Sequence, residues 1–181
     1  AVDKIGGERL RFRSGYSFKS PGFDINDVGY VRLADRRNVS NWMQVRYLTP
    51  ASWYRSVRVN FNQWAGWNYG SDLVNNGINV NAHVQFPNHW RVGAGANWNG
   101  EIFDDRLTRG GPGGLRPDRR SLWYYVEADE RKPVVPNFFG FVGGDHHGQR
   151  DLELNPSVTF RPSSALTVEP GLSWSRNRSA T

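Results

Sequence analysis

The sequence predicts an all-β protein: an antiparallel, up-and-down transmembrane β-barrel, of which this chain forms an arc of about nine strands. Three observations lead to this prediction. Apolar and polar residues alternate in strand-like segments such as INVNAHVQF (78–86), which places the two kinds of side chain on opposite faces of a strand. The connections between the segments are alternately long and short, as in outer-membrane barrels. Aromatic residues gather at both ends of the apolar face, as at the two interfaces of a membrane.

The composition favours strands over helices. The chain has 181 residues, with 20 Gly and eight Trp, which suits one domain of strands and turns. It has no Cys, a net charge of +6 and a mean hydropathy of −0.66, so disulfides and thiolate metal sites are excluded. No apolar run approaches the roughly 20 residues of a spanning helix. Barrel strands alternate, so their mean hydropathy stays low.

Nine strand-like segments follow one another along the chain. Most of them carry apolar residues at every second position, as Leu10, Phe12, Tyr16 and Phe18 do in the first. The segment VVPNFFGFVGG is apolar at most positions, so its two faces stay unassigned. Pro156 and Pro170 fall on the apolar face of the last two segments, where each removes a ladder donor and marks a bulge or a weak point. The segments are 9–19, 42–47, 57–69, 78–86, 90–99, 122–128, 134–144, 152–161 and 166–175.

The connections between these segments decide between a membrane barrel and a soluble sandwich. The long ones are 21–40, 70–77, 100–120 and 144–150, and the short ones are 50–55, 87–89, 130–133 and 162–164. A sandwich with Greek-key connections has no reason to sort its loops in this way. Nine antiparallel strands leave the first and last parallel, whereas bacterial barrels close with an even number. We therefore expect residues 1–181 to be a single segment of a larger barrel in a longer chain.

The aromatic residues of the apolar face fall into two groups, one near each end of the strands, with aliphatic residues between them. With the short connections placed below, the lower group is Tyr47, Phe86, Trp90 and Phe160, and the upper group is Trp67, Tyr69, Trp98 and Trp174. This arrangement is typical of the aromatic girdles that flank the lipid-facing band of outer-membrane barrels.

Several stretches resemble one known family. The runs SGYSFKSPGFDINDVGYVRLADRRNVSNWMQVRY, NFNQWAGWNYGSD, NVNAHVQFPNHW, FDDRLTRGGPGG and PSVTFRPSSALTVEPGLSWSRN are similar to the DUF5916 family of bacterial, carbohydrate-binding family 9-like proteins. The resemblance implies a barrel region in the outer membrane of a Gram-negative bacterium, preceded by a carbohydrate-binding-like module. It implies a connection to glycans and supplies no catalytic residues.

The polar face of the strands is the candidate binding site. Its side chains could line a wet lumen for polar or anionic solutes, since lumen charge tunes selectivity. They could equally fill a narrow lumen and bond only to one another. The candidate residues are Arg46, Arg58, Asn60, Asn62, Asn79, Asn81, His83, Arg91, Asn97, Glu127, Glu153 and Asn155.

The sequence gives little support for a hydrolase, a metal site or a nucleic-acid-binding surface. Asp104 and Asp105 are neighbours in one loop, whereas glycoside hydrolysis needs two carboxyls across a cleft, so we expect ion pairs there and no enzyme. DINDVG (24–29) lacks the closing Glu of a calcium loop, and we expect a turn. His146 and His147 lack a third ligand and would point to opposite strand faces, so no metal or other cofactor is expected. Arg residues are dispersed, which suits lipid phosphates and argues against nucleic acid.

The expected function is therefore a pore or transport channel in the bacterial outer membrane, or the membrane anchor of a glycan-binding protein. Its partners would be outer-membrane lipid, lipopolysaccharide and polar solutes such as oligosaccharides. The alternative is a soluble β-sandwich that binds carbohydrate through exposed Trp64, Trp67 and Trp98.

Overall fold

A computed structural model describes residues 1–24, 33–108 and 111–179. These residues form an antiparallel sheet of 11 strands and a separate two-stranded sheet. The main sheet contains β1 (Val2–Lys4), β2 (Leu10–Lys19), β3 (Arg36–Tyr47), β4 (Ser56–Trp67), β5 (Leu73–Gln85), β6 (Arg91–Asn99), β9 (Arg119–Glu127), β10 (Val134–Asp145), β11 (Arg150–Ser163), β12 (Leu166–Val168) and β13 (Trp174–Arg178). The small sheet pairs β7 (Ile102–Asp104) with β8 (Gly114–Arg116).

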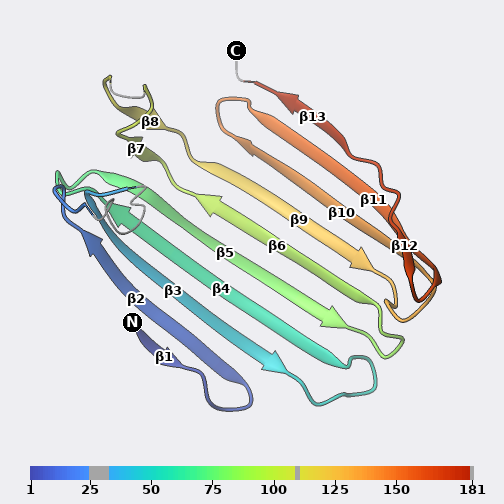
Figure 1. Cartoon of the computed structure of the whole chain (residues 1–181). Coiled ribbons are helices and arrows are strands. Elements are labelled where there is room, and N and C mark those ends of the chain that lie inside the picture. The colour runs from blue at the N-terminus through green and yellow to red at the C-terminus, as the bar shows by residue number, and fades with distance from the viewer. Residues whose placement is uncertain (25–32, 109–110, 180–181) are drawn as a thin grey trace.

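Strands of the main sheet lie side by side in chain order, with the β7–β8 hairpin inserted between β6 and β9 (Figure 1). All nine predicted strands are present, so the all-β, antiparallel, up-and-down prediction is confirmed. The three-residue strand β1, which pairs with Phe12–Ser14 of β2, was not predicted because it is too short to show alternation. The sheet is open: within the described residues, no pairing joins the β1 edge to the edge formed by β12 and β13.

The ninth predicted strand is split into β12 and β13. The position of the split is explained by Pro156 on the neighbouring strand β11. Its carbonyl accepts a hydrogen bond from the Leu172 amide at 2.9 Å, so the Pro156 nitrogen also faces this edge of the sheet. Because Pro has no N–H, one ladder bond is missing there. Between β12 and β13 the pairing with β11 falls to one isolated bridge, Ser157 to Gly171.

The predicted alternation of long and short connections is only partly correct. We call the end where β2 stops and β3 starts the upper end of the sheet. Its connections include the two longest, 20–35 and 100–118, but 68–72 and 146–149 are no longer than 48–55, 86–90 and 128–133 at the lower end. The reason is that some strands extend beyond their alternating part, as β5 does by starting at Leu73.

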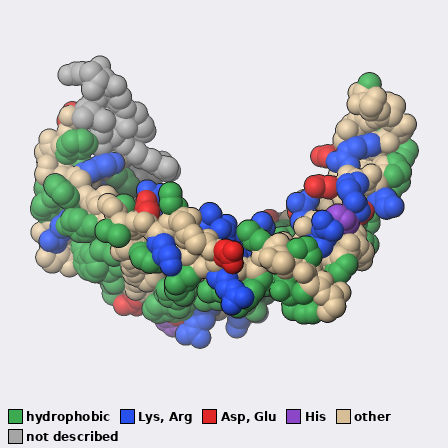
Figure 2. Space-filling view, turned by 90° about the horizontal axis from the view of Figure 1, so that it is seen from below, with side chains coloured by type: hydrophobic (Ala, Val, Ile, Leu, Met, Phe, Trp, Pro, Cys, Tyr) green, Lys and Arg blue, Asp and Glu red, His purple; other side chains and the backbone are tan. Residues whose placement is uncertain are grey.

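The two faces of the main sheet differ strongly. Figure 2 shows the sheet curved into an open trough with apolar side chains along its outer side. On this outer face Val80 is 45% exposed, Leu122 57% and Trp174 49%. Phe61 and Tyr124 are exposed there at mid-strand, so aromatic rings are not confined to the ends. Only Ala65, Ala128 and Val135 are buried hydrophobic residues in the described part of the chain.

The sheet therefore forms a single layer without a hydrophobic core of its own. In a β-sandwich a second sheet packs against the apolar face, and the described residues supply no such sheet. The apolar face consequently needs a cover from outside these residues. In the part of the chain that the structure describes, no helix is long and apolar enough to cross a membrane.

A polar row interrupts the outer face across β2, β3 and β4. The Ser14 hydroxyl donates to Asn41 Oδ1 at 2.7 Å, and Asn41 Nδ2 donates to Gln63 Oε1 at 2.5 Å. The three residues stand directly opposite one another in the sheet. The alternation did not predict this row, because each residue is an isolated exception within its strand.

Candidate functional site

The inner face of the trough carries the predicted polar residues, and the strand register brings most of them together. Asn62, Asn79 and Asn97 are direct neighbours across β4, β5 and β6. One step below, Asn60 stands opposite Asn81. Cross-strand neighbours on one face are close enough for their side chains to interact, so alternation alone places these amides within reach of one another.

Six amides form a continuous hydrogen-bonded chain, which we call the amide network. Gln44 Nε2 donates to Asn60 Oδ1 at 2.9 Å, and Asn60 Nδ2 donates to Asn81 Oδ1 at 2.7 Å. Asn79 Oδ1 accepts from both Asn62 Nδ2 and Asn81 Nδ2. Asn79 Nδ2 donates to Asn97 Oδ1 at 2.7 Å, and Asn97 Nδ2 donates to Ser121 Oγ at 3.0 Å. The members are Gln44, Asn60, Asn62, Asn79, Asn81 and Asn97.

His83 connects the amide network to an aromatic side chain. Its Nε2 lies 3.0 Å from Asn81 Oδ1, and its Nδ1 lies 2.8 Å from the Tyr125 hydroxyl oxygen. Tyr125 is on β9, two strands away from β5. The imidazole can bridge this distance because Gly93, which lies between them on β6, has no side chain.

Tyr125 and Trp123 form an aromatic platform on the inner face. Their rings are nearly parallel, with an interplanar angle of 6° and centroids 6.2 Å apart. A Cβ added at Gly93 would lie closer than 3.0 Å to the Tyr125 ring, and one added at Gly95 would lie 2.6 Å from the Trp123 ring. The rings thus occupy the space above two glycines of β6. The alternation did not predict this platform, because both residues stand at its polar positions.

Charged residues line an open hollow of about 680 Å³ at the lower end of the inner face. Arg91 forms ion pairs with Glu127, at 3.1 Å from Nε, and with Glu130. Arg58 stands directly opposite His83. Among the described residues, no hydrogen bond or ion pair engages its guanidinium group, so Arg58 is the unpaired cation of this hollow.

Three predicted residues lie apart from both the amide network and the lower hollow. Arg46 donates to the backbone carbonyls of Gly7 and Glu8, each at 3.1 Å. Glu153 and Asn155 are on β11, where Phe139 and Phe141 of β10 separate them from β9. The two faces of segment 134–144, which the sequence left unassigned, are now assigned. Phe139 and Phe141 face the inner side, and Phe138, Gly140 and Val142 face the outer side.

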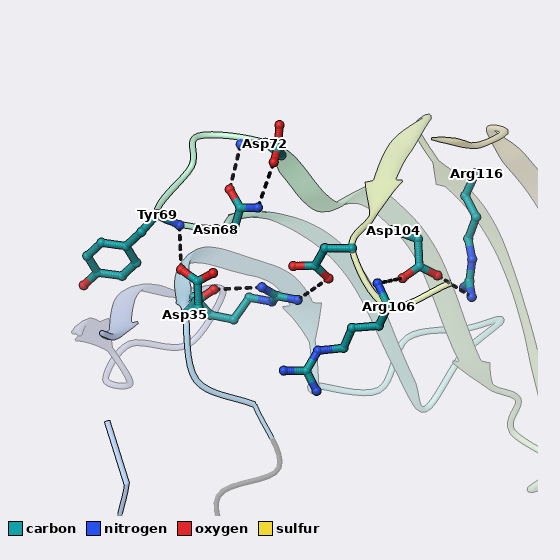
Figure 3. A network of polar contacts seen from close by, with 9 residues as sticks. Asp35, Asn68, Tyr69, Asp72, Asp104, Arg106 and Arg116 are labelled. Carbon is teal, nitrogen blue, oxygen red and sulfur yellow. Dashed lines mark hydrogen bonds and ion pairs between the residues drawn. The ribbon is translucent and has the colours of Figure 1, made fainter. Parts of the chain in front are cut away.

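The β7–β8 hairpin lies over the upper end of the inner face, held by an ion pair. Arg36 of β3 contacts Asp105, just after β7, at 2.7 Å, and both side chains are largely buried, at 12% and 22% exposure. Beside them, Asp35 accepts from the Tyr69 amide at 2.8 Å, and Asp104 pairs with Arg116 at 2.7 Å (Figure 3). The hairpin and the strands enclose an open hollow of about 720 Å³.

Asp104 and Asp105 are engaged in these ion pairs, as expected. No group of three or more His, Asp or Glu in the described residues could hold a metal ion. His146 and His147 lie in a turn, not a strand, with ring centroids 4.0 Å apart, so the expectation that they point to opposite faces was wrong. Residues 25–29 of DINDVG lie outside the described part of the chain.

A third open hollow, of about 860 Å³, lies on the outer face near its upper end. Its apolar lining includes Ile78, Ala96 and Leu122, and Arg120 and Arg150 line it as well. Asp118 pairs there with His146 at 2.5 Å, and this hydrogen bond lowers the pKa of the Asp118 carboxyl.

The tryptophans of the sandwich alternative do not form one surface. Trp64 lies on the inner face, where its ring occupies the space above Gly77. Trp67 and Trp98 stand on the outer face, on β4 and β6. Trp64 therefore does not share a face with the other two, because residues at odd and even positions of one strand point to opposite sides.

The fold and the site together define an all-β protein built on one curved antiparallel sheet, apolar outside and amide-rich inside. Within that class, the chain belongs to the DUF5916 family, described as a domain of unknown function, whose profile matches residues 1–181. No curated protein and no solved structure matches the chain. The family match carries no information on carbohydrate binding.

Proposed function

We propose that this chain is an arc of a larger outer-membrane β-barrel. In this proposal the outer face contacts lipid and the inner face lines an aqueous lumen. The barrel serves as a pore for polar or anionic solutes, glycans among them, or as the membrane anchor of a glycan-binding protein. The longer protein would supply the strands that continue from the two open edges, as barrel closure requires.

The observation that carries the proposal is the exposure of nearly the whole apolar face. Large apolar side chains stand out from every long strand, including Phe12 on β2, Val80 on β5 and Leu122 on β9, each more than a third exposed. Soluble monomers rarely expose an apolar patch of more than a few hundred Å². A cover that runs along the whole sheet and matches aliphatic side chains is supplied by lipid acyl chains.

The upper hollow of the outer face supports contact with charged lipids. Arg120 and Arg150 stand beside an apolar lining that would face acyl chains. Such cations near a membrane interface attract anionic headgroups. Phosphates of phospholipid or lipopolysaccharide are therefore the expected partners of these two residues.

Cysteine labelling in native membranes tests the proposal, because the chain has no Cys of its own. Val80→Cys and Asn81→Cys are introduced separately into the full-length protein and treated with a lipid-soluble or a membrane-impermeant maleimide. We expect position 80 to react only with the lipid-soluble reagent and position 81 to prefer the impermeant one, since neighbouring strand residues face opposite sides.

A second pair on β6, Ala96→Cys and Asn97→Cys, is the matched control. Val80 stands opposite Ala96, and Asn79 stands opposite Asn97, so the same contrast should recur. If positions 80 and 96 stay unreactive until the protein is denatured, the apolar face lies on a protein core and the proposal is wrong. A protein that is soluble without detergent leads to the same conclusion.

The polar row of the outer face yields a further prediction. In lipid, Gln63→Leu alone leaves the Asn41 amide without its acceptor, and we expect a loss of about 1–2 kcal/mol. The triple variant Ser14→Ala, Asn41→Leu, Gln63→Leu removes all partners together and should be as stable as the parent protein or more stable. Urea unfolding in liposomes measures both. A triple variant weaker than the single one would contradict lipid contact at this row.

A further inference from the structure

The inner face combines three features that are unusual side by side: a platform of two parallel aromatic rings, a row of hydrogen-bonding groups and an unpaired cation. The Trp123 and Tyr125 rings are parallel to within 6°. The His83 ring is adjacent to both, with centroids 5.9 and 5.7 Å away. Arg58 and Tyr125 both line the hollow of about 680 Å³. From this arrangement we infer a binding subsite for an acidic saccharide, a pyranose ring that carries a carboxylate.

The platform suits the face of a sugar ring. A pyranose presents C–H groups on its flat faces, and these pack well against an aromatic ring, whose face is electron-rich. Both ring side chains are only partly exposed, and their positions over Gly93 and Gly95 fix them against the sheet. A fixed ring loses little conformational entropy when a ligand stacks on it.

Polar groups next to the platform suit the hydroxyls at the edge of the sugar. Hydroxyls both donate and accept hydrogen bonds, and so do amides and imidazole. Asn81 and Asn60 belong to the amide network next to His83. Asn60 Nδ2 and Asn81 Nδ2 each donate one hydrogen bond within the network, and a flat apolar ligand without hydroxyls offers no acceptor to the second N–H of either amide. The site therefore favours a sugar over a planar aromatic compound.

The unpaired Arg58 indicates that the sugar carries an acidic group. Arg91 is already engaged by Glu127 and Glu130, whereas Arg58 has no carboxylate partner in the described residues. The planar fork of a guanidinium matches a carboxylate through two parallel hydrogen bonds. A neutral sugar has no carboxylate to pair with the Arg58 guanidinium.

This inference rests on the proposed function, since it requires an inner face open to water. Saturation-transfer NMR on the full-length protein in detergent micelles tests it, with digalacturonic acid and the neutral digalactose of the same linkage as probes. We expect the acidic disaccharide to bind more tightly. Trp123→Ala should lower the affinity for both at least tenfold, and Arg58→Gln should lower it for the acidic one only.

A glycine pair provides the matched control. Gly95→Ala places a methyl group against the Trp123 ring and so displaces the ring. It should therefore lower the affinity as Trp123→Ala does, although it removes no side chain that contacts the sugar. Gly140→Ala places a methyl group equally close to the Tyr124 ring, but on the outer face, and should leave binding unchanged.

Two results would overturn the inference: equal binding of the two disaccharides, or undiminished binding by Trp123→Ala. If neither sugar binds although the cysteine labelling gives the expected pattern, this inference fails and the proposed function stands. If labelling places the outer face on a protein core, both fail.

Discussion

Replacing Asn79 with Leu is expected to lower the free energy of unfolding by about 2–3 kcal/mol, since three neighbours lose a hydrogen bond worth about 1 kcal/mol each. Asn79 is the most connected member of the amide network: it accepts from Asn62 and Asn81 and donates to Asn97. Leu has a similar shape, so little of the effect should come from packing. Urea unfolding in detergent micelles measures the change.

Asn75 offers the matched control for this substitution. It lies on the same strand and the same face as Asn79, but it is exposed, and no hydrogen bond of its side chain is found in the described residues. Asn75→Leu should change the free energy of unfolding by less than about 0.5 kcal/mol, as surface substitutions usually do. Equal losses in the two variants would mean that the amide network contributes nothing specific.

The order and the facing of the strands could be predicted from the sequence because both depend on local alternation. Each run such as NVNAHV fixes which side chains share a face, and strands that follow one another in the chain usually become neighbours in the sheet. The amide network follows from these two facts, since Asn60, Asn62, Asn79, Asn81 and Asn97 all occupy polar positions.

The remaining features depend on pairs of residues far apart in the sequence. The aromatic platform requires Trp123 and Tyr125 to face Gly95 and Gly93, and this register is invisible within either strand alone. A signal was present, however: glycines at alternate positions of WRVGAGANWN leave space for large side chains on a neighbouring strand. The small strand β1 and the polar row through Gln63 left no periodic signal at all.

Asp105→Ala is expected to release the β7–β8 hairpin from the sheet. The Arg36–Asp105 pair joins residues 69 positions apart, and Arg36 is only 12% exposed, so the substitution leaves a largely buried cation without its partner. Breaking a fully buried pair costs about 3–5 kcal/mol, and about 2 kcal/mol is reasonable for this partly exposed one. Since 1.4 kcal/mol corresponds to a factor of ten, amide exchange at Ile102–Asp104 should accelerate about 30-fold.

Arg116→Ala separates this effect from a general loss of charge in the hairpin. Arg116 pairs with Asp104 at the same short distance of 2.7 Å, but it is 60% exposed, and exposed pairs contribute about 0–1 kcal/mol. We expect exchange in this variant to rise less than fivefold. The contrast tests whether burial, rather than the number of ion pairs, positions the hairpin over the inner face. If both variants exchange equally fast, the Arg36–Asp105 contact does not hold the hairpin, and the hollow between the hairpin and the strands must owe its shape to other contacts.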